Sequence, residues 1–84
     1  MKIKIYSTTW CPSCVSAKKF FDELNINYDE VNIENEGISR EELFKISGGR
    51  TVPQILINNK SIGGFSDLMI LNQSGDLKKI LDNV

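Results

Sequence analysis

Residues 2–14 read KIKIYSTTWCPSC, and they join an alternating segment to a CxxC motif through a short loop. Charged and apolar side chains alternate over residues 2–6, with Ile3 and Ile5 on one face, which is the two-residue period of a strand. Pro12 suits the first turn of a helix, because the backbone N–H groups of that turn have no intrahelical partner. The stretch therefore predicts a strand, a loop and a helix that begins at the first cysteine.

The helix and the segment after it complete a strand–helix–strand unit. Apolar residues recur with helical spacing at four positions, Ala17, Phe20, Phe21 and Leu24. Polar residues lie between them, which is typical of an amphipathic helix. Residues 25–27 interrupt this pattern, and residues 28–33 predict a second strand. Two strands joined by a helix are expected to be parallel, with a right-handed crossover.

The middle of the chain predicts a second helix followed by a β-hairpin. Ser39 and Glu42 have the spacing of a capping box, and the two glycines at 48–49 end the helix that they predict. The hairpin consists of a buried strand at 54–57, an Asn-Asn turn at 58–59 and a fourth strand at 60–63. Asparagine suits such a turn because it tolerates positive φ.

After the hairpin, Ser66 and Asp67 predict the cap of a third helix over residues 68–71. A last amphipathic turn has apolar residues at Leu77, Ile80, Leu81 and Val84. The element order β-α-β-α-β-β-α predicts an α/β fold, with a four-stranded mixed sheet flanked by helices. The length of 84 residues allows one domain, spanning residues 1–84.

Composition excludes several classes of function. The net charge is −1, with ten basic residues spread among eleven acidic ones, so a nucleic-acid or anionic-membrane partner is not expected. No apolar run approaches the roughly 20 residues of a membrane span. The alternating N-terminal residues differ from a secretory signal, and two cysteines are too few for a disulfide-stapled scaffold. A cytoplasmic location is therefore the simpler expectation.

The CxxC motif at a strand–helix junction predicts thiol–disulfide chemistry. Cys11 lies at the helix N-terminus, where unpaired N–H groups and the macrodipole favour an anion. Lowering a thiol pKa from about 8.5 to about 7 raises the thiolate fraction at neutral pH roughly tenfold. Cys14 lies one turn further along and is expected to be more shielded. Cys11 is therefore the predicted nucleophile, and Cys14 the thiol that resolves its mixed disulfides.

Other interpretations of these residues are weaker or stay open. A structural zinc site needs four ligands, and the chain has no histidine and no second cysteine pair. Trp10 is either a core aromatic or a residue at the rim beside the sulfur. Pro53 alone favours a plain proline at the start of a strand, and a cis bond is the less common alternative.

The second half of the chain offers candidate binding groups. Val52 can present its backbone to an extended peptide. Ser66 and Asp67 can hold the two charged ends of an amino acid, or they can form a simple turn and helix cap. Arg40 is either a solvated helix charge or a clamp for a ligand.

Four segments together resemble the glutaredoxin family. In order and spacing, the family signature matches residues 5–6 (IY), 10–14 (WCPSC), 50–55 (RTVPQI) and 62–68 (IGGFSDL). The similarity is greatest to short bacterial dithiol glutaredoxins. It implies a thioredoxin-like fold, a cis peptide before Pro53, and reduction of protein disulfides and glutathione mixed disulfides with glutathione as the reductant. It also implies a monomer that needs no metal.

The resemblance assigns binding roles residue by residue. Val52 is expected to bind the cysteinyl part of glutathione through its backbone, and Arg40 to lie near the glycine carboxylate. The γ-glutamyl end is assigned to Ser66 and Asp67, while Thr51 and Gly64 line the groove. Pro53 is also assigned to the glutathione site.

The chain departs from the family pattern at two positions. Thr8 replaces a common lysine, which removes a positive charge near the thiolate and the glutathione carboxylate, and Ser13 replaces the usual tyrosine. Two alternatives therefore stand beside the leading interpretation. One is a donor reduced by thioredoxin reductase, for example for ribonucleotide reductase, and the other is an iron–sulfur-binding glutaredoxin.

Overall fold

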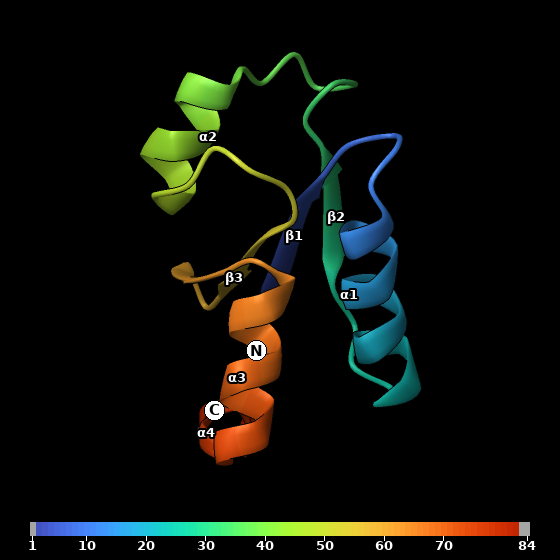
Figure 1. The fold of residues 1–84 in the computed structure, drawn as a ribbon, viewed down its shortest axis with the longest axis vertical. Helices are drawn as coiled ribbons and strands as arrows, with labels where there is room; N and C mark the ends of the chain where they lie inside the picture. Colours follow the sequence, from blue (N-terminus) through green and yellow to red (C-terminus); the bar gives the residue numbers. More distant parts are fainter. Residues whose placement is uncertain (1, 83–84) are drawn as a thin grey trace.

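Four strands form one mixed sheet in the order β2-β1-β3-β4, with helices on both of its faces (Figure 1). The computed structural model describes residues 2–82. Its elements are β1 (Ile3–Ser7), α1 (Pro12–Glu23), β2 (Asp29–Asn32), α2 (Arg40–Ser47), β3 (Gln54–Ile57), β4 (Lys60–Gly63), α3 (Phe65–Ser74) and α4 (Asp76–Asp82). The predicted four-stranded mixed sheet flanked by helices is confirmed.

The strand pairing follows from the connections. The crossover through α1 makes β2 parallel to β1, with Ile5 opposite Glu30. The other neighbour of β1 is β3, which runs antiparallel to it, and the tight turn makes β4 antiparallel to β3. Asn58 and Asn59 of that turn have φ of 52° and 68°, as predicted from their tolerance of the left-handed region.

The two faces of the sheet bury different side chains. Ile3, Ile5, Ile55 and Ile57 point to the face covered by α1, α3 and α4, where Phe21 and Leu68 are fully buried. Tyr6 and Leu56 point to the opposite face, where they pack with Ile33 and with Leu43 of α2. The unbroken apolar run of β3 is thus explained, because its strand is buried on both sides. Each such side chain contributes roughly 1.5–3 kcal/mol of burial free energy.

The helix caps agree with the sequence in one case and differ in another. Ser39 and Glu42 form the predicted capping box, and Gly48 ends α2 with φ of 82°. The cap predicted at Ser66 and Asp67 is wrong, because α3 begins at Phe65. The cap is Gly64, whose N–H donates to Asp67 Oδ2 at 3.0 Å, so Asp67 supports the helix from its first turn.

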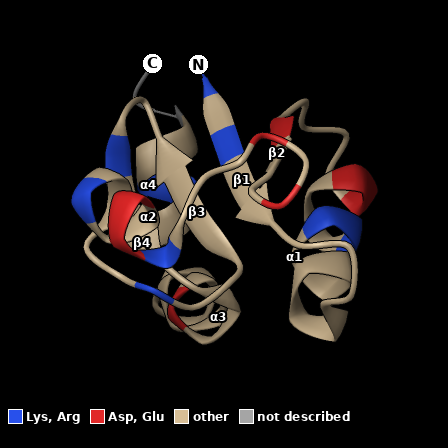
Figure 2. Cartoon of the chain, turned by 90° about the horizontal axis from the view of Figure 1, so that it is seen from above, with Lys and Arg blue, Asp and Glu red and all other residues tan. Residues whose placement is uncertain are grey.

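The predicted last turn forms α4, which contains Leu77, Ile80 and Leu81, while Val84 lies outside the described residues. Both ends of β1 and both ends of β2 lie one residue from their predicted positions. Basic and acidic residues are interspersed over the helices and strands (Figure 2). None of the helices among residues 2–82 has the length and apolar character needed to cross a bilayer.

Candidate active site

The two cysteines lie at the N-terminus of α1, where they form a disulfide with a Cα–Cα distance of 5.2 Å. Cys11 is the helix cap, in an extended conformation, and its Sγ accepts a hydrogen bond from the Cys14 N–H at 3.1 Å. The first turn of α1 carries no acidic residue. A sulfur anion at this position therefore has a backbone donor and no neighbouring carboxylate within its own helix turn, which favours its charged form.

The two sulfurs differ in exposure as predicted. Cys14 is 1% exposed and Cys11 is 8% exposed, so Cys11 is the more accessible of the pair. Trp10 is 85% exposed, which decides between the two interpretations of this residue: it lies at the rim and not in the core.

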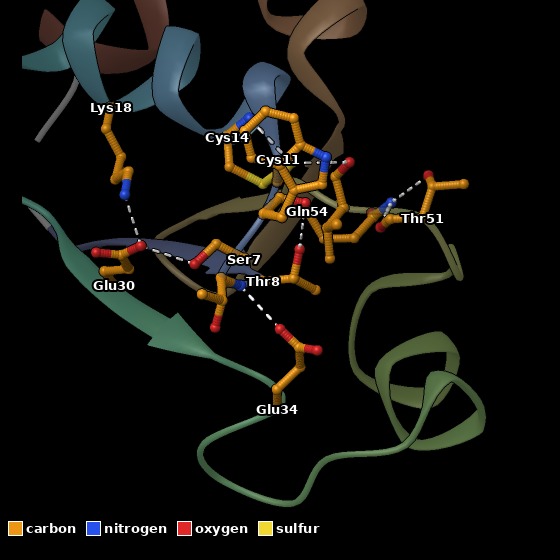
Figure 3. Close-up of a disulfide and its surroundings, with 12 residues drawn as sticks. Ser7, Thr8, Cys11, Cys14, Lys18, Glu30, Glu34, Thr51 and Gln54 are labelled. Atoms are coloured by element: carbon orange, nitrogen blue, oxygen red, sulfur yellow. Dashed lines mark hydrogen bonds and ion pairs between the residues drawn. A yellow bond between two sulfur atoms is a disulfide. The ribbon is translucent and has the colours of Figure 1, made fainter.

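Hydrogen bonds with side chains of β2 and of the segment after it hold the loop before Cys11. The Thr9 N–H donates to Glu34 Oε1 at 2.8 Å (Figure 3), and Asn32 Nδ2 donates to Thr9 Oγ1 at 3.3 Å. Thr8 Oγ1 donates to the Trp10 carbonyl at 3.2 Å. The loop between β1 and α1 is thus fixed by Thr8 together with Asn32 and Glu34, two residues that sequence reasoning did not identify.

A charged cluster lies beneath this loop. The buried Ser7 hydroxyl and Lys18 Nζ both donate to Glu30 Oε2, each at 2.8 Å (Figure 3). The hydrogen bond from Lys18, followed by that from Ser7, holds the pKa of Glu30 below its ordinary value. The cluster ties β1, α1 and β2 together next to the strand end that leads to the cysteines.

The segment before β3 approaches the disulfide from the other side. The Val52-Pro53 peptide is cis, as the resemblance implied, whereas the residues alone favoured a plain strand-start proline. The Val52 carbonyl oxygen lies 3.7 Å from Cys11 Sγ. This is a contact and not a hydrogen bond, because a disulfide sulfur carries no proton.

A shallow cleft of about 240 Å³ lies beside the disulfide. It is lined by Ser13, Thr51, Val52, Pro53, Gly64, Phe65, Ser66 and Asp67. Six of the seven predicted glutathione-binding residues thus come together at one cleft. A larger hollow of about 650 Å³ lies between the β3–β4 hairpin and the two last helices, but it contains neither cysteine, so it is not the candidate active site.

Arg40, the seventh predicted residue, does not line this cleft. Its Nη1 donates to the Arg50 carbonyl at 2.9 Å, immediately before Thr51. The guanidinium is therefore attached to the loop that forms one wall, and its remaining N–H groups stay available to an anion near that wall.

Two glycines allow the walls of the cleft to approach closely. Gly63 has φ of 100°, and a Cβ there would collide with the Asp67 carboxylate. A Cβ on Gly64 would lie 3.3 Å from the Pro53 carbonyl oxygen. A side chain on Gly64 would push the Pro53 backbone away from the start of α3, and a side chain on Gly63 would displace the Asp67 carboxylate.

Gln54 is a further residue that sequence reasoning did not assign to the site. It is buried, and its Nε2 donates to the Thr51 carbonyl at 2.9 Å and to Thr51 Oγ1 at 3.3 Å (Figure 3). The one available signal was its polar side chain at the head of an otherwise apolar strand. Among the described residues, no group of three or more His, Cys, Asp or Glu side chains could hold a metal ion.

Comparisons with known proteins agree with this site. The family model described as Glutaredoxin matches residues 3–62. Glutaredoxin 1 of Rickettsia typhi is 44% identical over 82 residues, covering 95% of this chain and 79% of the relative. Glutaredoxin 3 of Escherichia coli is 38% identical over 79 residues, covering 94% of this chain and 95% of the relative.

A crystal structure of a buckwheat glutaredoxin–glutathione complex is similar over 96% of this chain and 76% of that chain, with a TM-score of 0.85 and 30% identity. The thioredoxin-like fold that the resemblance implied is therefore confirmed.

Proposed function

This chain belongs to the glutaredoxin family and is a thiol–disulfide oxidoreductase, and we propose that glutathione is its reducing co-substrate. The observation that carries the proposal is the cleft that opens beside Cys11, with the Val52 backbone on one wall and Asp67 on the other. Its volume is below the roughly 300–1,000 Å³ of enclosed ligand pockets, which suits a tripeptide lying across a surface groove.

In the proposed reaction the Cys11 thiolate attacks the glutathione sulfur of a mixed disulfide. The Cys11–glutathione bond forms as the bond to the substrate sulfur breaks, and the substrate leaves as a thiolate that takes up a proton. A second glutathione thiolate then attacks the glutathione sulfur held on Cys11. Glutathione disulfide and the Cys11 thiolate are released, so two electrons have passed from glutathione to the substrate.

Protein disulfides require the second cysteine. Attack by Cys11 leaves the substrate protein bound through a mixed disulfide, and the Cys14 thiolate then attacks Cys11 Sγ. The substrate leaves fully reduced, and the Cys11–Cys14 disulfide forms. Two glutathione molecules reduce this disulfide again, the first by attacking Cys11 Sγ and the second by attacking the resulting mixed disulfide.

The chemistry of glutathione fits the groups of the cleft. The cysteinyl part has a backbone that can pair with Val52 as an added strand. The γ-glutamyl end has an ammonium for the Asp67 carboxylate and a carboxylate for the backbone N–H groups at the start of α3. In this proposal the glycine carboxylate pairs with Arg40, whose guanidinium donates to the Arg50 carbonyl next to the Thr51 wall. The buckwheat protein, which has the same fold, was solved with glutathione.

Coupled assays that follow NADPH consumption test the choice of reductant. One contains glutathione and glutathione reductase, and the other contains thioredoxin reductase alone, with the same glutathionylated and disulfide substrates. We expect turnover in the first assay and little in the second. Turnover in the second assay only would overturn the assignment of glutathione, and it would favour a donor reduced by thioredoxin reductase.

A further inference from the structure

Gln54 is one of two buried polar residues among residues 2–82, and the residue is 4% exposed. Its amide lies beneath the segment that leads into β3. Nε2 donates to both the carbonyl and the hydroxyl of Thr51. Because the Thr51 carbonyl is an acceptor only, the nitrogen of the amide must face it.

The segment before β3 closes directly over this amide. A Cβ built on Gly49 would lie 2.6 Å from Gln54 Nε2, so the backbone at Gly49 passes against the amide. Residues 49–53 thus form a loop with the Gln54 side chain inside it. The loop carries Thr51 and Val52, which line the cleft beside the disulfide.

The hydrogen bond to the Thr51 carbonyl fixes the plane of the Thr51-Val52 peptide. In a trans peptide the C=O and N–H groups point in opposite directions. The Thr51 carbonyl points inward to Gln54, so the Val52 N–H points outward, away from the buried amide. No hydrogen bond among the described residues uses the Val52 N–H, which leaves it available to a ligand.

We propose that Gln54 is a positioning residue that aims the Val52 N–H into the cleft and thereby sets the affinity for the cysteinyl backbone of a bound thiol peptide. The inference rests on the proposed function, because that function supplies the peptide. Among the described residues, no hydrogen bond joins Gln54 to either cysteine, so its role is in recognition and not in sulfur exchange. Gln54→Met keeps most of the side-chain volume and removes the donor. Gln54→Glu keeps the shape but turns an ionised oxygen toward the Thr51 carbonyl.

The test is a titration of the reduced protein with S-methylglutathione, which cannot form a disulfide, monitored by the Val52 amide resonance. We expect Gln54→Met to weaken binding about fivefold, as for one lost hydrogen bond, and Gln54→Glu to weaken it more. The rate at which iodoacetamide alkylates Cys11 should stay unchanged, because this small reagent needs no cleft. The matched control is Gln73→Met, which makes the same change at an exposed position of α3.

The outcomes separate the two proposals. If the unmodified protein binds S-methylglutathione and both Gln54 variants bind it equally well, the positioning role is wrong and the proposed function stands. If the unmodified protein does not bind it, both proposals fail. If Gln54→Met does not fold, the binding of S-methylglutathione to Gln54→Glu decides whether the positioning role is right. A slower alkylation of Cys11 in a folded variant would contradict a role confined to recognition.

Discussion

The two sides of the active site are built in different ways. On the sulfur side, the contact between the Cys14 N–H and Cys11 Sγ joins residues three positions apart. On the cleft side, the contact between Val52 and Cys11 joins residues 41 positions apart, and the second wall comes from the start of α3. Sulfur chemistry therefore depends on one strand–helix junction, whereas recognition depends on the whole sheet. Substitutions on the two sides should change different kinetic parameters.

The largest effects are expected from the two cysteines themselves. Cys11→Ser should lower every activity by more than about a thousandfold, the scale of a lost nucleophile, because a serine hydroxyl does not ionise near neutral pH. Cys14→Ser should keep the reduction of glutathione mixed disulfides and lose most reduction of protein disulfides. The coupled glutathione assay with one substrate of each kind measures both. Loss of both activities in a folded Cys14→Ser protein would contradict the assigned roles.

Asp67→Asn should produce the next largest effect, and only on the cleft side. Asparagine removes the charge but keeps an oxygen that can accept from the Gly64 N–H, so the start of α3 is preserved. Hydrogen bonds to charged groups contribute roughly 1.5–3 kcal/mol, so KM for a glutathionylated peptide should rise about tenfold or more. The value of kcat should change little.

Asp29→Asn, at an exposed position of β2, is the control for this substitution. Comparing KM and kcat of the two variants in steady-state kinetics separates the effect of removing a negative charge at the cleft from the effect of removing one elsewhere. A fall in kcat with unchanged KM for Asp67→Asn would place the carboxylate in the chemical step and remove the distinction between the two sides.

The same contrast explains what the sequence could predict. The nucleophile and its shielded partner follow from a CxxC at a helix start, because the relevant contacts are local. The loop contacts of Glu34 and the buried amide of Gln54 have no comparable pattern, since each contacts a partner that only the folded chain brings near. The predicted start of α3 is wrong because the cap, Gly64, has no side chain that the sequence could reveal. Asp67, inside the helix, instead accepts the hydrogen bond from the Gly64 N–H.

Thr8→Lys should have a smaller effect that reaches both sides. Thr8 is half-buried at the loop before the disulfide, and a lysine there adds a positive charge near the thiolate and the glutathione. A screened interaction of about 1 kcal/mol corresponds to a severalfold lower KM, together with a lower midpoint in the thiolate absorbance titration. Both changes should shrink as salt is added.

Asn72→Lys, at an exposed position of α3, adds the same charge outside the cleft and serves as the control. If it lowers KM as much as Thr8→Lys does, net charge and not the position of the lysine determines the effect.

The smallest expected effect concerns stability on the sulfur side. Hydrogen bonds from Lys18 and Ser7 hold the pKa of Glu30 below its ordinary value of 4.5. This stabilisation is present above that value and is lost as the pH falls through the lowered pKa. Because the Glu30 side chain is 37% exposed, its contribution should stay below about 1 kcal/mol. The free energy of unfolding in urea should therefore be lower for Glu30→Gln than for the unmodified protein at neutral pH. This difference should vanish in acid. The control is Glu36→Gln, at an exposed turn, which should show no such trend. A difference that grows as the pH falls would mean that the protonated carboxyl, and not its ion pair with Lys18, holds β2 to α1.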